Sequence, residues 1–323
     1  MLVGDPHVRV QNMAESERLL GFVKAQAKSH GADAVVFMGD LFHNHAVLRM
    51  EVVQFWQRWA TSFGDINFVC IVGNHDQAGS RQAERSGSAL DTIKGLSEGV
   101  MVFDQCGLLF DSIGIVPYVS CEETFLEECH RVFEMGGKKT LLCHQTFSGA
   151  HYGAMYAPDG FDSEKVPQAS IISGHIHSAQ RFGKVWYPGT PRWEGLADAN
   201  LEKSIYVLDF DQAGRLTGEL KISTEGVSIK VVSFAVSEGE PLPELDESHK
   251  NVIELSGTSQ WISSIKKDIP AGVRVVARPK DSKTLLARQL APVDSIEGFL
   301  EKGFKTTLDK KLLSEKVRRL MNG

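Results

Sequence analysis

Short apolar runs that read as buried strands recur along this chain, and polar side chains with metal-binding or acid–base chemistry follow five of them. The runs lie at 2–4, 34–38, 66–72, 140–143 and 169–173. The polar residues that follow them are Asp5 and His7, Asp40, Asn74 with His75 and Asp76, His144, and His175 with His177. Ligand sites in open α/β sheets form outside the carboxyl ends of the strands, so these five endings are expected to converge on one site.

Helical periodicity separates several of these strands. Residues 13–29 carry apolar side chains on one helical face between the first two strands, which predicts a β-α-β unit with a parallel crossover. Further helices are expected at about 46–62 and 122–135. The helix at 46–62 is apolar on more than one face, which either the rest of the domain or a second copy of the chain can bury.

The pattern of expected strands and helices changes near residue 225. Before it, short antiparallel strands are expected at 100–103, 107–110, 112–116, 204–210 and 215–223. We therefore expect a first domain over 1–224. Residues 225–285 contain three expected strands with a helix at about 259–268, which predicts a small α+β domain. Two helical patterns, at roughly 294–302 and 307–321, occupy the last segment, 286–323.

Composition narrows the class of protein only a little. The chain has 323 residues, 42% apolar and 24% charged, as ordinary globular proteins do. We find no apolar run near the ~20 residues that span a bilayer and no N-terminal signal segment, so we expect a cytoplasmic protein with no membrane partner. Five cysteines, an odd number without a CxxC motif, favour reduced thiols.

Charge is unevenly distributed. The net charge of −6 gives no general indication of nucleic-acid binding. From Trp261 to the end, however, 14 Lys and Arg residues face 7 Asp and Glu residues. Such a basic segment can contact phosphates or an acidic partner, and a solvated helical surface explains it equally well.

The residues at the strand ends suit a pair of divalent cations. Two ions roughly 3.5–4 Å apart can clamp a phosphate, activate a water and neutralise developing charge. Mixed carboxylate, imidazole and amide ligation fits manganese, iron or zinc in a catalytic role, and magnesium is a further alternative. The candidate ligands are Asp5, His7, Asp40, Asn74, His144, His175 and His177.

A hydrolase of this kind also needs a proton for the leaving oxygen. His75 adjoins a candidate ligand and can act as general acid, and Asp76 can orient it or serve as an ordinary helix cap. His43 can hold the phosphate, although His45 can do the same and either can be a plain surface residue. Arg81, Arg85 and Tyr152 lie in two irregular loops, where they can bind substrate or simply belong to mobile or locally packed segments.

The order Asp-x-His, Gly-Asp, Gly-Asn-His-Asp, His, Gly-His-x-His over residues 4–177 resembles the calcineurin-like metallophosphoesterases. More narrowly, the segments 39–43, 174–177 and 187–191 resemble the SbcD-type nucleases of DNA double-strand-break repair, including viral versions. The resemblance implies an α/β fold, a β-sandwich flanked by helices in α/β/β/α layers. It also implies that 225–285 is a DNA-binding capping domain and that the helices of 286–323 bind an ATPase.

The same resemblance implies roles for the candidate residues. It assigns two metal ions, most often Mn²⁺, to two ligand sets: Asp5, His7, Asp40 and His177, and Asp40, Asn74, His144 and His175. His75 would assist the leaving group and His43 would place the scissile phosphate. The implied partners are DNA, an SbcC-type coiled-coil ATPase and a second copy of the chain.

Three functions are therefore weighed. The first is a manganese-dependent DNA exonuclease and endonuclease of recombination, repair and replication, working in a bacterial cytoplasm or an infected host cell. The second is a small-molecule phosphodiesterase or phosphatase with the same metal centre. The third is a non-catalytic scaffold that binds DNA ends or the ATPase; it has no need of the candidate ligands, which disfavours it.

Overall fold

The computed structural model describes residues 1–44, 47–78, 87–152, 155–157 and 160–281. The larger of its two units comprises Met1–Phe234, Pro243–Ile253 and Gly272–Arg274. The smaller unit contains Ala235–Leu242, Glu254–Ala271 and the described residues from Val275 onward. The helices expected in 286–323 lie outside the described residues. Among those that are described, no helix combines the length and apolar character that crossing a membrane requires.

The first sheet of the larger unit has six strands in the order β14-β13-β1-β2-β3-β4. Their bounds are Leu2–Val3 (β1), Ala34–Phe37 (β2), Asn67–Ile71 (β3), Val100–Phe103 (β4), Ser204–Phe210 (β13) and Leu216–Ser223 (β14). Strands β1 to β4 run parallel, and β13 is antiparallel to β1 and β14. The carboxyl ends of β1, β2 and β3 therefore meet at one edge.

The second sheet also has six strands, in the order β11-β12-β10-β7-β6-β5. Their bounds are Gly107–Leu109 (β5), Ile113–Val116 (β6), Thr140–His144 (β7), Ser170–Gly174 (β10), Gln180–Phe182 (β11) and Val185–Tyr187 (β12). The central strands β7 and β10 are parallel and in register, with Gly174 opposite His144. Their carboxyl ends are therefore level. A short hairpin, His151–Tyr152 (β8) and Met155–Tyr156 (β9), lies apart from both sheets.

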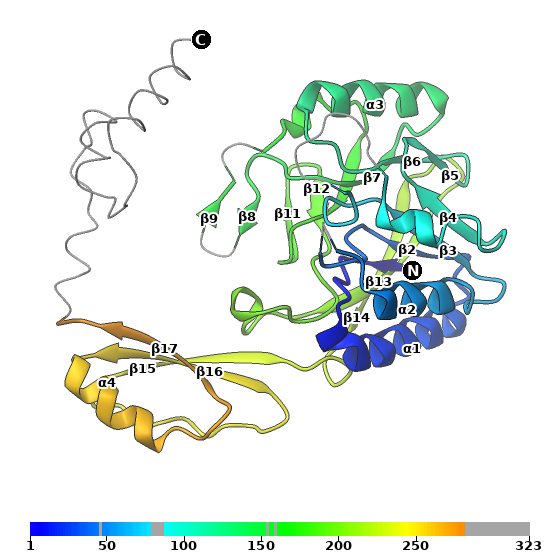
Figure 1. Ribbon diagram of the computed structural model, residues 1–323. Coiled ribbons are helices and arrows are strands. Elements are labelled where there is room, and N and C mark those ends of the chain that lie inside the picture. The colour runs from blue at the N-terminus through cyan, green and yellow to red at the C-terminus, as the bar shows by residue number, and fades with distance from the viewer. Residues whose placement is uncertain (45–46, 79–86, 153–154, 158–159, 282–323) are drawn as a thin grey trace, which may run out of the picture. The chain divides into compact units, whose positions relative to one another are not determined.

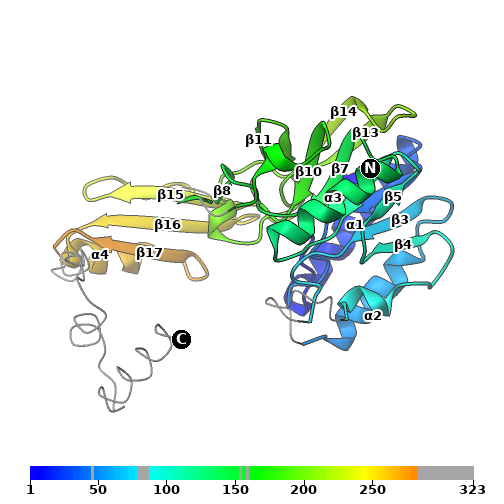
Figure 2. The ribbon, with the colours of Figure 1, turned by 90° about the horizontal axis from the view of Figure 1, so that it is seen from above.

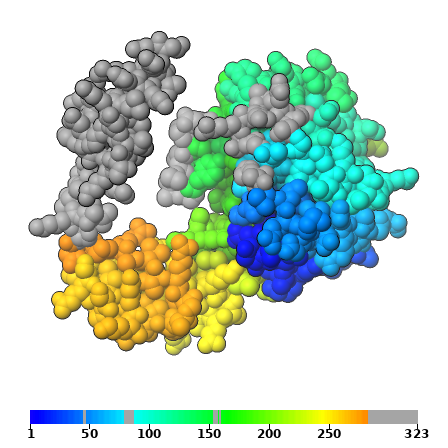
Figure 3. Space-filling model, viewed as in Figure 1, coloured from blue at the N-terminus to red at the C-terminus, as the bar shows by residue number. Residues whose placement is uncertain are grey.

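The two sheets pack face to face between helices, which gives the α/β/β/α layers (Figure 1). Helices α1 (Met13–Ser29) and α2 (Met50–Ala60) cover the first sheet, and α3 (Glu122–Met135) covers the second. Side chains of β2 alternate between two cores, with Phe37 facing the helices and Val36 facing the other sheet. Strands buried on both faces explain the continuous apolar runs in the sequence. Figure 2 shows the same layers from above, and Figure 3 shows α2 (blue) and α3 (green) at the surface.

The three strands that follow the sandwich form a separate sheet in the order β15-β16-β17. Their bounds are Val231–Ser237 (β15), Lys250–Gly257 (β16) and Arg274–Pro279 (β17). Helix α4 (Ser259–Ile265) is capped by Thr258, whose side chain accepts a hydrogen bond from the Trp261 N–H, and a 3₁₀ turn continues it to Asp268. These strands and this helix are the elements predicted for this part of the chain.

Two expectations about local structure were wrong. The helix predicted from about residue 46 begins at Met50, because Arg49 has an extended backbone (φ −84°, ψ 127°) and caps it. The strand at 100–103 is β4, which runs parallel to β3 rather than antiparallel. The long connection from Ile71 to Val100 leaves room for the crossover that a parallel pair requires.

Candidate metal centre

The carboxyl ends of β1, β2 and β3 in one sheet and of β7 and β10 in the other bring the predicted ligands together. The His175 N–H donates to Asp5 Oδ2 at 2.7 Å, across 170 residues of sequence. Potential ligand atoms gather in three overlapping groups: Asp5, His7 and His177; His7, Asp40 and His75; and Asp40, His144 and His175. Asp40 and His7 each belong to two of them. Six of the seven predicted ligands and His75 thus lie in one cluster, and Asn74 joins it beside His144 and His175. Metal binding by these residues remains a prediction.

One side of the cluster is formed by Asn74, His144 and His175 around Asp40. Asn74 Oδ1 lies 2.8 Å from His175 Nδ1 and 3.1 Å from His144 Nε2, and the two ring nitrogens are 3.3 Å apart. Asp40 Oδ2 is 3.3 Å from the same His144 Nε2. The His144 Nδ1–H donates to the Met38 carbonyl at 2.8 Å, so Nε2 points at these oxygens, to which it can donate when protonated, and it would offer its lone pair to a cation in the neutral ring. A cation between them satisfies all four groups.

The other side is formed by Asp5, His7 and His177. His7 Nε2 lies 3.1 Å from His177 Nε2 and 3.7 Å from Asp40 Oδ2. Asp5 Oδ1 and His7 Nδ1 are buried and have no hydrogen-bond partner. A buried carboxylate oxygen without a partner is costly unless a cation or a proton meets it. This side therefore also fits a metal ion.

Each carboxylate of the centre also braces a neighbouring loop. Asp5 accepts the His175 N–H, and Asp40 Oδ1 accepts the His75 N–H at 2.8 Å. One oxygen of each is thus held by backbone, which leaves Asp5 Oδ1 and Asp40 Oδ2 facing the centre. The braces orient the carboxylates before any ligand binds.

The charges of the centre are poorly balanced in the absence of a cation. Burial raises the pKa of Asp5 to about 8, and burial together with Asp40 raises that of Asp76 to about 7. Burial alone would also raise the pKa of Asp40, but the adjacent His144 and His7 hold it well below its usual range. Burial disfavours the charged His144, yet Asp40 and Asp5 outweigh it and raise its pKa to about 10. A divalent cation would supply the positive charge that one proton on His144 now provides.

The backbone is strained at three candidate ligands. His7, Asp40 and His175 have φ values of 43°, 50° and 80°, a region that residues other than glycine rarely adopt. Gly39 before Asp40 has φ 116°, and a Cβ there would lie 2.2 Å from His144 Nδ1. The Gly-Asp pair of the sequence is therefore a requirement of close packing at this site.

The proposed proton donor lies beside the cluster. His75 Nδ1–H donates to the His43 carbonyl at 2.6 Å, which directs Nε2 toward the group containing His7 and Asp40. Asp76 does not act through a hydrogen bond to this ring: its oxygens accept the N–H groups of Phe42 and Gly73, both at 3.0 Å. The structure therefore favours a bracing role for Asp76 over the orienting role considered above.

The other predicted site residues differ in position. The Arg9 guanidinium donates to His43 Nε2 at 2.9 Å, and burial together with Arg9 lowers the pKa of His43 to about 4. The Tyr152 ring lies 6.3 Å from that of His175, with its hydroxyl 2.8 Å from Thr146 Oγ1. Arg81, Arg85 and the alternative His45 lie outside the described residues.

Sequence reasoning missed the aromatic ring of Tyr118. It stacks 6.2 Å from the ring of His175, at an interplanar angle of 27°. Tyr118 follows β6, the neighbour of β7, so its position at the end of a strand was the signal that could have found it.

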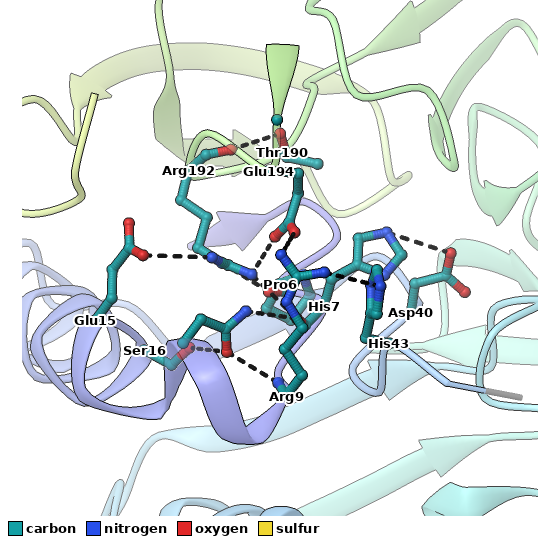
Figure 4. A network of polar contacts seen from close by, with 12 residues as sticks. Pro6, His7, Arg9, Glu15, Ser16, Asp40, His43, Thr190, Arg192 and Glu194 are labelled. Carbon is teal, nitrogen blue, oxygen red and sulfur yellow. Dashed lines mark hydrogen bonds and ion pairs between the residues drawn. The ribbon is translucent and has the colours of Figure 1, made fainter. Parts of the chain in front are cut away.

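Sequence reasoning also missed a buried arginine that fixes the first ligand loop. Arg192 donates through Nε to the Pro6 carbonyl and through Nη2 to the His7 carbonyl, both at 3.0 Å. Its charge is met by Glu15 at 3.5 Å and by Glu194 (Figure 4). Figure 4 also shows Arg9 reaching from this network to His43.

A buried lysine fixes the last ligand loop in the same way. Lys203 Nζ donates to the His177 carbonyl and to Thr190 Oγ1, both at 2.8 Å, and pairs with Asp198 at 2.6 Å. In the sequence, the feature that drew attention to the residues around this loop was the turn-rich segment Pro188–Pro191. A buried cation cannot be distinguished from a surface one by residue type alone.

A sandwich of two sheets with aspartate and histidine ligands at the carboxyl ends of its strands defines a metal-dependent phosphoesterase architecture. The model of the family described as calcineurin-like phosphoesterase matches residues 1–179, and the chain belongs to this family.

The chain is also similar to two known proteins. "Putative phosphoesterase 078R" of Invertebrate iridescent virus 3 is 28% identical over 204 residues, covering 59% of this chain. The match spans 56% of that relative's length. Among solved structures, the sulfate thiohydrolase SoxB of Thermus thermophilus, in complex with glycerol, aligns with 17% identity and a TM-score of 0.36. That alignment covers 65% of this chain and 42% of the other.

Proposed function

We propose that this phosphoesterase is a two-metal DNA nuclease, with exonuclease activity on duplex ends and endonuclease activity. The two-metal proposal depends on the position of the Asp40 carboxylate between the two proposed ligand sets. Asp40 Oδ2 lies 3.3 Å from His144 Nε2 in one set and 3.7 Å from His7 Nε2 in the other. A carboxylate placed between two imidazole groups is what a bridged pair of cations requires.

Two ligand sets are proposed for the two ions. Asp5, His7, Asp40 and His177 would hold one ion, and Asp40, Asn74, His144 and His175 the other. Manganese is the proposed metal, because carboxylate, amide and imidazole donors together suit it, although magnesium, iron and zinc accept parts of the same set. When bound, the metals supply a nucleophile at neutral pH and neutralise charge on the phosphate.

The chain's own residues supply proton transfer and positioning. To act as general acid, His75 would carry a proton on both ring nitrogens: it would give the Nε2 proton to the leaving oxygen and keep the Nδ1 proton, whose bond to the His43 carbonyl fixes the ring. His43, held by Arg9, places the scissile phosphate. Tyr118 and Tyr152 flank His175 and offer aromatic surface to a base.

The wider assignments are inferences from sequence resemblance. We propose DNA as substrate, an SbcC-type ATPase as partner, a homodimer, and a role in recombination, repair or replication in an infected cell. The matched viral protein supports only the phosphoesterase part of this proposal. The basic segment from Trp261 onward supports contact with phosphates.

The test compares labelled duplex DNA with an aryl phosphodiester in the presence of Mn²⁺. We expect DNA cleavage that His75→Ala lowers by 10²–10⁴, roughly the share of a general acid. Calorimetry should find two Mn²⁺ per wild-type chain and fewer with Asp40→Asn, whose amide oxygen can still accept the His75 N–H and keep the loop braced. Turnover of the aryl ester alone would favour the small-molecule phosphodiesterase, and function in cells left untouched by His75→Ala would favour the scaffold.

A further inference from the structure

A pocket of about 260 Å³ opens beside His43. It forms where the segment after β1 meets the segment after β2, which the parallel bridge between Val8 and Phe42 joins. Arg9 lines the pocket and also contacts His43, so the pocket adjoins the proposed phosphate position. The proposed mechanism uses His43 and Arg9 but none of the other residues that line the pocket.

The walls of this pocket combine an apolar floor with positive charge. Val8 and Phe42 are buried in the floor, whereas Val47 stands 60% exposed at the rim. Arg9 and Arg49 also line the pocket, and none of its described lining residues is an Asp or Glu. This composition is unusual in a chain of net charge −6.

A larger cavity provides the contrast. It has about 700 Å³ and lies at the amino ends of β2 and β3, away from the ligand-bearing strand ends. Its lining includes Asp33, Asp65, Asp209 and Asp211, which would repel a phosphate. The smaller pocket is the one whose charge suits an anionic substrate.

We infer that the pocket beside His43 binds the nucleotide next to the scissile phosphate of an oligonucleotide. This inference rests on the proposed nuclease function and specifies a subsite for it. The sugar and base contact Val47 and the buried floor, and the next phosphate binds the arginines. The pocket is smaller than the roughly 300–1,000 Å³ of drug-sized sites, so it has no room for more than one nucleotide.

The two arginines are suited to this task in different ways. Arg9 is anchored by His43 and by Glu194 at 3.4 Å, so its guanidinium is fixed in position. Arg49 pairs only with exposed Glu51 among its described ion-pair partners, at 3.0 Å. An exposed pair of this kind contributes little, so a phosphate, which accepts two parallel N–H donors, can replace the carboxylate.

The test uses Arg49→Gln and, as a matched control, Arg58→Gln. Both arginines belong to exposed ion pairs at helix α2, but Arg58 pairs with Glu17 and does not line the pocket. With Mn²⁺ and a short labelled oligonucleotide, Arg49→Gln should raise KM about tenfold and reduce the salt slope of binding by about 1. Its kcat/KM for an aryl phosphodiester should fall much less, and Arg58→Gln should match the wild type on both substrates.

A second variant tests the apolar rim. Val47→Asp places a carboxylate where the sugar and base would lie and near the adjoining phosphate, and an exposed residue tolerates this change without loss of folding. It should also raise KM for the oligonucleotide. Wild-type KM values and salt slopes in Arg49→Gln and Val47→Asp, with DNA cleavage intact, would overturn the subsite and leave the proposed nuclease function standing. A wild-type chain that hydrolyses only the aryl ester would overturn both.

Discussion

Replacing Arg192 by methionine tests whether this buried arginine stabilises the fold and holds His7 in position at the candidate metal centre. Arg192 is 1% exposed, and its loss leaves Glu15 and Glu194 buried beside an apolar side chain. Breaking a buried ion pair by removing one partner costs about 3–5 kcal/mol. The loss of the hydrogen bonds to the Pro6 and His7 carbonyls would add to this cost. Arg9 still pairs with Glu194, however, so we expect the free energy of unfolding to fall by an amount within the same range.

The same substitution should weaken metal binding, because the His7 carbonyl loses one of its two side-chain donors and keeps only Asn12 Nδ2, so the ligand is less well held. Removing a group that orients a ligand typically costs about 10–100-fold in metal affinity. The double variant Arg192→Met/Glu194→Gln separates the loss of folding stability from the loss of metal affinity. It neutralises a buried carboxylate that, of its two arginine partners, would keep only Arg9, and it should regain roughly 1–3 kcal/mol of stability. It should not regain metal affinity, because the His7 carbonyl still lacks the Arg192 donor.

Urea unfolding of the metal-free protein, followed by tryptophan fluorescence, measures the first effect, and calorimetric Mn²⁺ titration measures the second. Arg58→Met is the control: its ion pair is exposed, so we expect a loss below about 1 kcal/mol and unchanged Mn²⁺ binding. A loss for Arg192→Met no larger than that of the control, or unchanged Mn²⁺ affinity, would refute the reasoning.

Three further substitutions probe other parts of the fold. Gly39→Ala should abolish Mn²⁺ binding in calorimetry, because the new Cβ would lie 2.2 Å from His144 Nδ1 at a φ of 116°; wild-type affinity would contradict the packing argument. Lys203→Met leaves Asp198 buried and unpaired, which should cost about 3–5 kcal/mol in urea unfolding, and Lys203→Arg should retain more of the stability. Phe125→Ala opens a cavity under α3 and should cost about 3–5 kcal/mol while Mn²⁺ affinity persists; loss of both would show that this core and the site are coupled.

The ligand set was predictable because its signal is local. Each candidate ligand follows a run of apolar residues, and in a parallel sheet that position by itself assigns the side chain to the carboxyl edge. Helices α1 and α3 occupy the residues predicted for them, since their apolar positions recur at helical spacing. The sequence could therefore place His144 and His175 in one site without any knowledge of strand order.

The supporting residues were not predictable, because their roles depend on contacts between distant parts of the chain. Arg192 and Lys203 look like surface residues until the Pro6–His7 loop and the His177 loop lie against them. The direction of β4 likewise depends on a crossover rather than on its own residues. The pattern of apolar residues identifies a strand and says little about its neighbour.

The strained backbone at three candidate ligands explains why the site needs the buried residues that support it. Left-handed conformations at His7, Asp40 and His175 cost on the order of 1–3 kcal/mol each, so something must hold them. The Asp5 carboxylate binds the His175 N–H, and Arg192 binds the His7 carbonyl. At Asp40 the constraint is instead the bond from its carboxylate to the His75 N–H. These buried hydrogen bonds thus offset the backbone strain at the candidate ligands. Because Arg192, which makes one of them, carries a charge that must itself be paired, the site lies against a network of buried ion pairs.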